Sequence, residues 1–158
     1  MKIGIGITVS CVAVLMLGAC GNSQSMNNDN LETVKITLER TECYGFCPVY
    51  TLTILGDGTV IYDGKDHVQT LGMIEITIDE AKIEKLVEKF EALDYFSFNN
   101  EYTERTITDA PTVTTSITLD GKTKTVKHYH GDFNAPEELG QLEDYIDEIV
   151  NSSQWIDE

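Results

Sequence analysis

Positive charge is scarce in this chain of 158 residues, which has 11 Lys and Arg against 27 Asp and Glu. Nucleic-acid binding requires clustered cations that displace the counterions of phosphate groups. The composition therefore excludes nucleic acid as a partner, and it disfavours adsorption to anionic lipid headgroups. We interpret the acidic excess as a means of keeping the protein soluble rather than as a site for a cationic partner.

Recognisable catalytic motifs are also missing. The sequence has no Gly-x-Ser-x-Gly elbow, no His-Glu-x-x-His motif and no glycine-rich phosphate loop. Its paired acids, such as Glu137 with Glu138 or Asp147 with Glu148, fall on predicted helices, where a solvated face is expected to carry them. We therefore expect no catalytic residues and no cofactor, which favours a non-enzymatic role.

Long hydrophobic runs are limited to the N-terminus. Lys2 precedes an apolar run that ends in Leu-Gly-Ala-Cys at positions 17–20, a pattern that resembles the bacterial lipobox. A transmembrane helix is the alternative, but about 15 apolar residues are short for a bilayer that needs ~20, and no basic flank follows. We expect residues 1–19 to be a cleaved signal peptide and Cys20 to become the lipidated first residue.

The lipid on Cys20 is expected to hold the protein on a membrane, because acyl chains such as palmitate contribute about 0.8 kcal/mol per buried methylene. Loss of Lys2 with the signal leaves 10 Lys and Arg against 27 acids, a formal charge of −17, so the protein surface adds no attraction. Residues 20–31 are polar and predict a flexible tether.

The resemblance to lipoproteins also implies an address in the cell envelope. Gly21 rather than Asp follows the cysteine. In a bacterium with two membranes this implies the periplasmic side of the outer membrane, and otherwise the outer face of the cytoplasmic membrane.

Residues 32–158 are long enough for one domain with its own core. Apolar alternation predicts strands near 34–39, 49–55, 59–62 and 74–78, then a helix after Asp79, strands at 112–119 and 122–129, and a helix from Pro136. We predict an α+β fold, an antiparallel sheet in the order β-β-β-β-α-β-β-α with both helices packed on one face as a two-layer sandwich.

Two Asp-Gly pairs predict the hairpin turns. A two-residue turn at positions 57 and 58 would place Ile54 opposite Ile61. A two-residue turn at positions 120 and 121 would place Val113 opposite His128, so that this histidine points inward. His130 is two residues further on and shares its face.

Two cysteines are left as thiols once Cys11 has gone with the signal and Cys20 has been acylated. In an oxidising compartment Cys43 and Cys47 are expected to form a disulfide. The ring is small, so its closure stabilises the fold by about 2 kcal/mol on the chain-entropy formula. Its expected role is to fix one loop.

The alternative is thiol-redox or metal chemistry at this loop. The pattern Cys-x-x-x-Cys-Pro resembles the copper site of certain thioredoxin-fold assembly proteins, but there a helix follows, whereas residues 49–54 here alternate as a strand. A copper or zinc site built from Cys43, Cys47 and His128, with His130 nearby, would require the two loops to meet.

Further candidates lie near the cysteine loop. Arg40 falls at the end of the inward phase of the first strand, and Asp109 falls at the entry of the second hairpin, which favours a structural ion pair over an active site. Together with Tyr44, Tyr50 and His128, they form the candidate binding surface.

Five segments carry a family resemblance: 36–41, 43–50, 56–60, 108–111 and 120–122. The most specific is Cys-Tyr-Gly-x-Cys-Pro-x-Tyr at 43–50. Together they resemble the bacterial family of the domain of unknown function 6438 over nearly all of the mature domain. The resemblance implies domain boundaries, and it implies no activity, substrate or cofactor.

These observations give three functional hypotheses. The first is a membrane-anchored envelope lipoprotein, non-enzymatic, whose disulfide loop and sheet edge bind another envelope protein or a cell-wall ligand. The second is the thiol or metal protein described above. The third is a tethered structural spacer, in which substitutions around Tyr44 and Tyr50 would have no effect.

Overall fold

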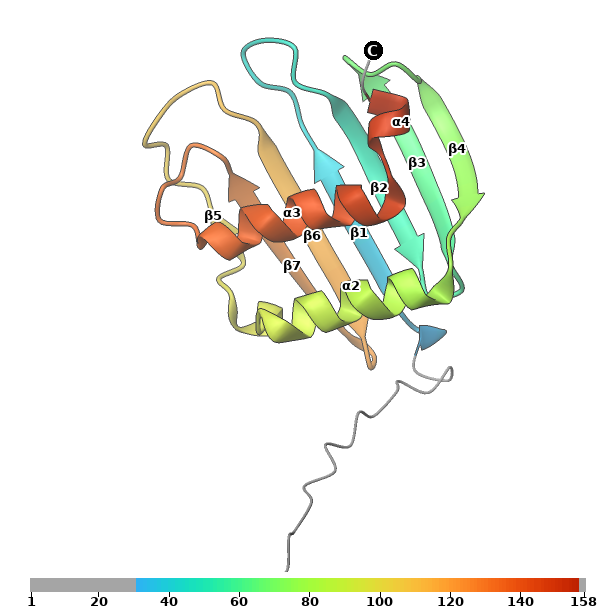
Figure 1. The fold of residues 1–158 in the computed structure, drawn as a ribbon. Helices are drawn as coiled ribbons and strands as arrows, with labels where there is room; N and C mark the ends of the chain where they lie inside the picture. Colours follow the sequence, from blue (N-terminus) through green and yellow to red (C-terminus); the bar gives the residue numbers. More distant parts are fainter. Residues whose placement is uncertain (1–30, 157–158) are drawn as a thin grey trace, which may run out of the picture.

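A computed structural model of the chain describes residues 31–156 (Figure 1). The predicted signal peptide, the lipidated Cys20 and nearly all of the tether lie outside these residues. Within 31–156, no helix is long and apolar enough to cross a membrane.

The described chain forms one sheet and the helices that cover it. Its elements in order are β1 (Lys35–Arg40), β2 (Val49–Leu55), β3 (Thr59–Asp66), β4 (Gly72–Thr77), α2 (Glu80–Ala92), the 3₁₀ helix η1 (Tyr95–Ser97), β5 (Glu101–Tyr102), β6 (Thr112–Leu119), β7 (Lys122–Tyr129), α3 (Glu137–Val150) and α4 (Ser153–Ile156). The strand order across the sheet is β4-β3-β2-β1-β6-β7-β5. This confirms the predicted α+β class.

Both long helices lie on the same face of the sheet, as predicted (Figure 1). Each turns its apolar stripe toward that face, because residues three and four apart share one side of a helix. The core between helices and sheet contains Ile83, Leu86, Val87 and Phe90 of α2, Leu139, Leu142, Ile146 and Val150 of α3, and inward residues of the central strands such as Ile36, Leu38, Leu52, Ile54 and Ile117. The opposite face of the sheet is the more solvated one.

The prediction of a purely antiparallel sheet was wrong in one detail. Besides the six predicted strands, the described residues include β5, which pairs in parallel with β7 and makes the sheet mixed. It is only two residues long. Alternation cannot reveal so short a strand, because it contains a single period of the pattern.

The predicted register of the first hairpin was also wrong. Ile54 pairs with Val60, and Ile61 pairs with Thr53. The turn therefore has three residues, 56–58, and ends at Gly58 with a φ of 86°. Such a loop needs a left-handed residue at its last position, and glycine adopts that conformation without strain.

The second hairpin has the predicted register. Asp120 and Gly121 both have positive φ, as a two-residue turn of this hand requires, and Val113 lies opposite His128. The sheet thus directs His128 toward the helices.

The start of the described chain and the cysteine loop lie at opposite ends of the sheet. Leu31, where the described chain begins, packs at the end where β1 starts: its carbonyl accepts a hydrogen bond from the Val34 amide. Strand β1 then crosses the sheet to Arg40, and the cysteine loop follows at the opposite end (Figure 1). Candidate site residues therefore gather at the end far from Leu31.

Candidate functional site

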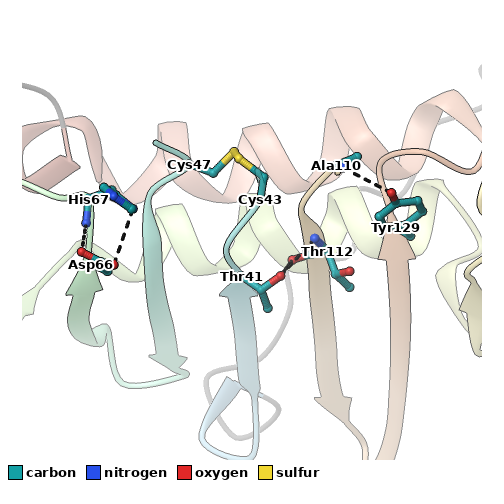
Figure 2. Close-up of a disulfide and its surroundings, with 8 residues drawn as sticks. All are labelled: Thr41, Cys43, Cys47, Asp66, His67, Ala110, Thr112 and Tyr129. Atoms are coloured by element: carbon teal, nitrogen blue, oxygen red, sulfur yellow. Dashed lines mark hydrogen bonds and ion pairs between the residues drawn. A yellow bond between two sulfur atoms is a disulfide. The ribbon is translucent and has the colours of Figure 1, made fainter. Parts of the chain in front are cut away.

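The Cys43–Cys47 disulfide closes the loop between β1 and β2, as predicted (Figure 2). The loop is tied to the first residue of β6 and to the segment before it. The hydroxyl of Thr41 accepts from the Thr112 amide at 3.1 Å, and the Tyr44 amide donates to the Asp109 carbonyl at 3.1 Å. The disulfide therefore braces a loop that is also held to the sheet.

A pocket of about 320 Å³ opens beside this loop, between the sheet and the C-terminal helices. Its walls come from the end of β1, the start of β2, the segment entering β6, and α3 with α4. Lining residues are Arg40, Thr41, Cys47, Pro48, Tyr50, Pro111, Val113, His130, Asp144, Asp147, Ser152, Ser153 and Ile156.

Asp147 organises the polar wall of the pocket. One of its oxygens accepts hydrogen bonds from Nε and Nη2 of Arg40, at 3.0 and 2.8 Å. The other accepts from the hydroxyls of Tyr50 and Ser152, at 2.7 and 2.6 Å. Charged hydrogen bonds of this kind are the strong ones, so β1, β2 and the α3–α4 turn are fixed relative to one another.

The same network sets the protonation states in the pocket wall. Burial alone would lower the pKa of Arg40, but the Asp147 carboxylate outweighs this and raises the pKa above its ordinary value. Burial raises the pKa of Tyr50, and the charge of Asp147 raises it further. Arg40 is therefore charged and Tyr50 neutral across the physiological pH range.

The predicted ion pair between Arg40 and Asp109 was wrong. Arg40 pairs with Asp147 and, at 3.3 Å, with the exposed Asp144. Asp109 lies in a turn with a φ of 70°, and its carboxylate accepts from the Thr108 hydroxyl. Sequence alone could not distinguish these partners, because the choice depends on where α3 crosses the sheet.

The interpretation of Asp147 as part of a solvated helix face was likewise wrong. Only 18% of its side chain is exposed, against 82% for Asp144. Asp147 follows Glu143 by four residues, so both lie on one side of α3. The spacing of these two acids along a buried stripe was the signal that sequence reasoning missed.

The other predicted surface residues separate into different places. Tyr50 is buried, and its hydroxyl bonds to Asp147, so it is no surface residue. Tyr44 is 86% exposed and lines a second hollow together with Asp109. Phe46, beside it in the loop, is 88% exposed and contacts His67 edge-on. An exposed aromatic pair on a braced loop is typical of an interaction surface.

His128 belongs to a third place, between β7 and α3. Its Nδ1 lies 2.9 Å from one oxygen of Glu143, and Nε2 of His130 lies 2.8 Å from the other. Glu143 is fully buried. Burial would raise the pKa of Glu143, but the bonds from the two histidines outweigh it and lower the pKa.

Within residues 31–156, His128, His130 and Glu143 form the group of side chains whose donor atoms lie close enough together to bind one metal ion. Cys43 and Cys47 are bonded to each other and do not join His128 there. Two of the three residues were predictable, since the register of the second hairpin places His128 inward with His130 on the same face. Glu143 was not among the predicted candidates, because an acid within the apolar stripe of α3 gives no local signal that it is buried.

The fold and the braced loop together define a small α+β module built on one open sheet. No curated protein matches the chain. Residues 34–150 match the model of a family described as Domain of unknown function (DUF6438). The match spans more than half of the chain, so the chain belongs to this family, as its motifs predicted.

Proposed function

We propose that this chain is a lipid-anchored protein of the cell envelope and that its domain is a non-enzymatic binding module. The ligand site is the pocket beside Arg40 and Asp147. The observation that carries this proposal is the pre-organised wall: Asp147 is held by Arg40, Tyr50 and Ser152 before any ligand arrives. A site that needs no ordering on binding loses less free energy to entropy.

The pocket wall favours binding over catalysis. Both oxygens of Asp147 are already occupied by protein donors, and Tyr50 keeps its proton. Neither group is therefore placed to exchange a proton with a substrate. What remains for a ligand is a mixed surface of hydrogen-bonding and apolar side chains.

The lining indicates what kind of ligand suits the pocket. The exposed carboxylate of Asp144 and the side chains of His130 and Ser153 offer polar contacts, while Pro48 and Ile156 offer apolar ones. About 320 Å³ accommodates a small group or a few residues rather than a folded surface. A peptide segment, from another envelope protein or from the cell wall, has this mixture of groups.

The position of the pocket agrees with anchoring through Cys20. The described chain begins at Leu31, at the end of the sheet opposite the cysteine loop (Figure 1). A lipid attached eleven positions before Leu31 therefore leaves the pocket and the exposed side chains of Tyr44 and Phe46 on the far end. That arrangement suits a module that presents a binding surface away from its membrane.

The sole tryptophan of the chain gives a direct test of binding. Trp155 packs on Tyr62, and its neighbours Ser153 and Ile156 line the pocket. Titration with soluble muropeptides released from cell wall is expected to change Trp155 fluorescence saturably. Ser153→Arg, which puts a large side chain into the pocket, should abolish the change.

Thr125→Arg is the matched control for this titration, because Thr125 is exposed on the solvated face of β7. It should respond like the original chain. A fluorescence change that survives Ser153→Arg, or that is lost equally in Thr125→Arg, would contradict binding in the pocket.

Anchoring is tested separately by Cys20→Ser. Removing the thiol that accepts the lipid should move the protein from the membrane fraction to the soluble fraction of disrupted cells. Unchanged membrane association of Cys20→Ser would overturn the anchoring proposal.

The alternative function, thiol-redox or copper or zinc chemistry at Cys43 and Cys47, makes a different prediction. It requires the pair to be isolated as thiols, whereas a structural disulfide resists alkylation until the protein is reduced. Mass analysis after alkylation, with and without reductant, separates the two.

A further inference from the structure

Glu143, at the middle of α3, has a carboxylate with no exposed surface. This carboxylate lies between the imidazole rings of His128 and His130. Glu143 is fully buried, and both of its oxygens face histidine nitrogens. Burying a charge is costly unless it is paired or coordinates a metal. We propose that His128, His130 and Glu143 form a binding site for one zinc ion, a role that goes beyond ligand binding at the neighbouring pocket.

The donor atoms suit zinc in type and spacing. The two imidazole nitrogens and one carboxylate oxygen all lie within 4.8 Å of one another. Zinc takes such ligands at about 2.0–2.2 Å, which sets them roughly 3.4 Å apart in a tetrahedron. Small changes in side-chain torsion angles therefore bring all three to bonding distance.

The elements that hold the ligands are rigid. His128 is a residue of β7, His130 follows the strand's last residue, and Glu143 is in the middle of α3. Residues two apart on an extended chain share a face, so the two imidazoles meet the helix together. Ligands on a strand and a helix are positioned more accurately than ligands on loops.

Charge also favours a cation at this place. The rings of His128 and His130 lie 4.6 Å apart between centroids, so two protonated imidazoles would repel each other. A zinc ion binds neutral imidazoles, so it would take the place of the protons that lie between each histidine and Glu143. It would also supply the positive charge that the buried carboxylate needs. With one carboxylate and no thiolate, the set suits zinc better than copper(I).

A hollow of about 320 Å³ leads from the surface to the two histidines. Asp132, Phe133, Pro136 and Gly140 are among its lining residues. A side-chain carbon added at Gly140 would meet nothing within 4 Å, so the helix leaves this side open. Three protein ligands with an open fourth position are the arrangement in which zinc keeps a water molecule or binds a ligand directly.

The test is a zinc titration of the full chain, with free thiols alkylated beforehand and no reductant present. Alkylation blocks any cysteine that is neither acylated nor paired, while the disulfide keeps Cys43 and Cys47 from binding metal. We expect one zinc ion per chain by calorimetry, with a zinc-dependent rise in melting temperature that a chelator reverses.

Two variants and one control make the result specific. Glu143→Gln keeps the shape of the side chain and removes its charge, and His130→Asn alters a half-buried ligand that the fold tolerates more readily. Each should weaken zinc binding at least tenfold, with circular dichroism confirming that the variant is folded. His67→Asn removes the third histidine of the chain, at a position whose φ of 49° suits asparagine, and should bind zinc like the original.

Cobalt(II) offers a second readout that does not depend on stability. Bound to two imidazoles, a carboxylate and water, it should give the visible absorption of a four-coordinate ion, absent in His130→Asn. Failure of the original chain to bind one zinc ion saturably, or equal binding by His130→Asn, would overturn the proposal.

Discussion

The guanidinium of Arg40 donates two hydrogen bonds to a single oxygen of Asp147, 107 positions further along the chain. This contact joins the last residue of β1 to the last turn of α3. The second oxygen of Asp147 binds Tyr50 and Ser152, so four donors converge on one carboxylate. The pocket wall is therefore a single connected unit rather than a set of independent side chains.

Replacing Asp147 by alanine is expected to lower the free energy of unfolding by about 3 kcal/mol, because the largely buried charge of Arg40 would keep only the exposed Asp144 as a partner. Asp144→Ala is the matched control. Its side chain is 82% exposed, so the loss should be below about 0.5 kcal/mol. Urea unfolding of the three proteins checks both values, and similar losses for the two variants would contradict the assignment of Asp147 as the organising residue.

Changing Cys43 and Cys47 together to serine should cost about 2 kcal/mol and leave the fold intact. The ring closes a separation of only four residues, so it removes little entropy from the unfolded chain. Hydrogen bonds from Tyr44 and Thr112 still hold the loop to its neighbour. Denaturation measurements together with circular dichroism check this, and loss of the folded state in the double variant would show that the loop depends on the disulfide alone.

Alkaline pH is expected to destabilise the fold through its buried tyrosines. Burial raises the pKa of Tyr50 and Tyr95 above the value near 10 that each has in the unfolded chain. The unfolded state therefore loses protons that the folded state keeps, and stability falls as pH rises above about 10. Each tyrosine contributes up to about 1.4 kcal/mol per pH unit.

Unfolding free energies measured between about pH 8 and pH 11 check this slope. Tyr95→Phe should flatten the decline by removing one titrating group, although it also loses the hydrogen bond from the tyrosine hydroxyl to the Thr115 carbonyl. An alkaline decline equally steep in Tyr95→Phe would mean that other groups cause it.

Patterns that repeat within one element were sufficient to predict most of the fold. Ile83, Leu86, Val87 and Phe90 recur at three and four, so α2 and its buried face could be read directly. The two-residue turn at Asp120 fixed the register of β6 and β7, and with it the inward direction of His128.

Features that depend on contacts between distant elements could not be read in the same way. The first hairpin contains two glycines, Gly56 and Gly58, so loops of two and of three residues were both compatible with the sequence. The partner of Arg40 depends on how α3 crosses the sheet, which no local pattern encodes. Glu143 and Asp147 look like ordinary surface acids until the helix is placed on its core.

If the pocket end of an anchored domain contacts a ligand, photocrosslinking in intact cells should capture that ligand. A photoreactive phenylalanine at position 153, on the pocket rim, is compared with the same residue at position 125, on the solvated face of the sheet. We predict a discrete adduct with an envelope protein or cell-wall peptide from position 153 only, and its loss in Cys20→Ser. Equal adducts from both positions, or none from position 153, would show that the pocket is not the ligand site.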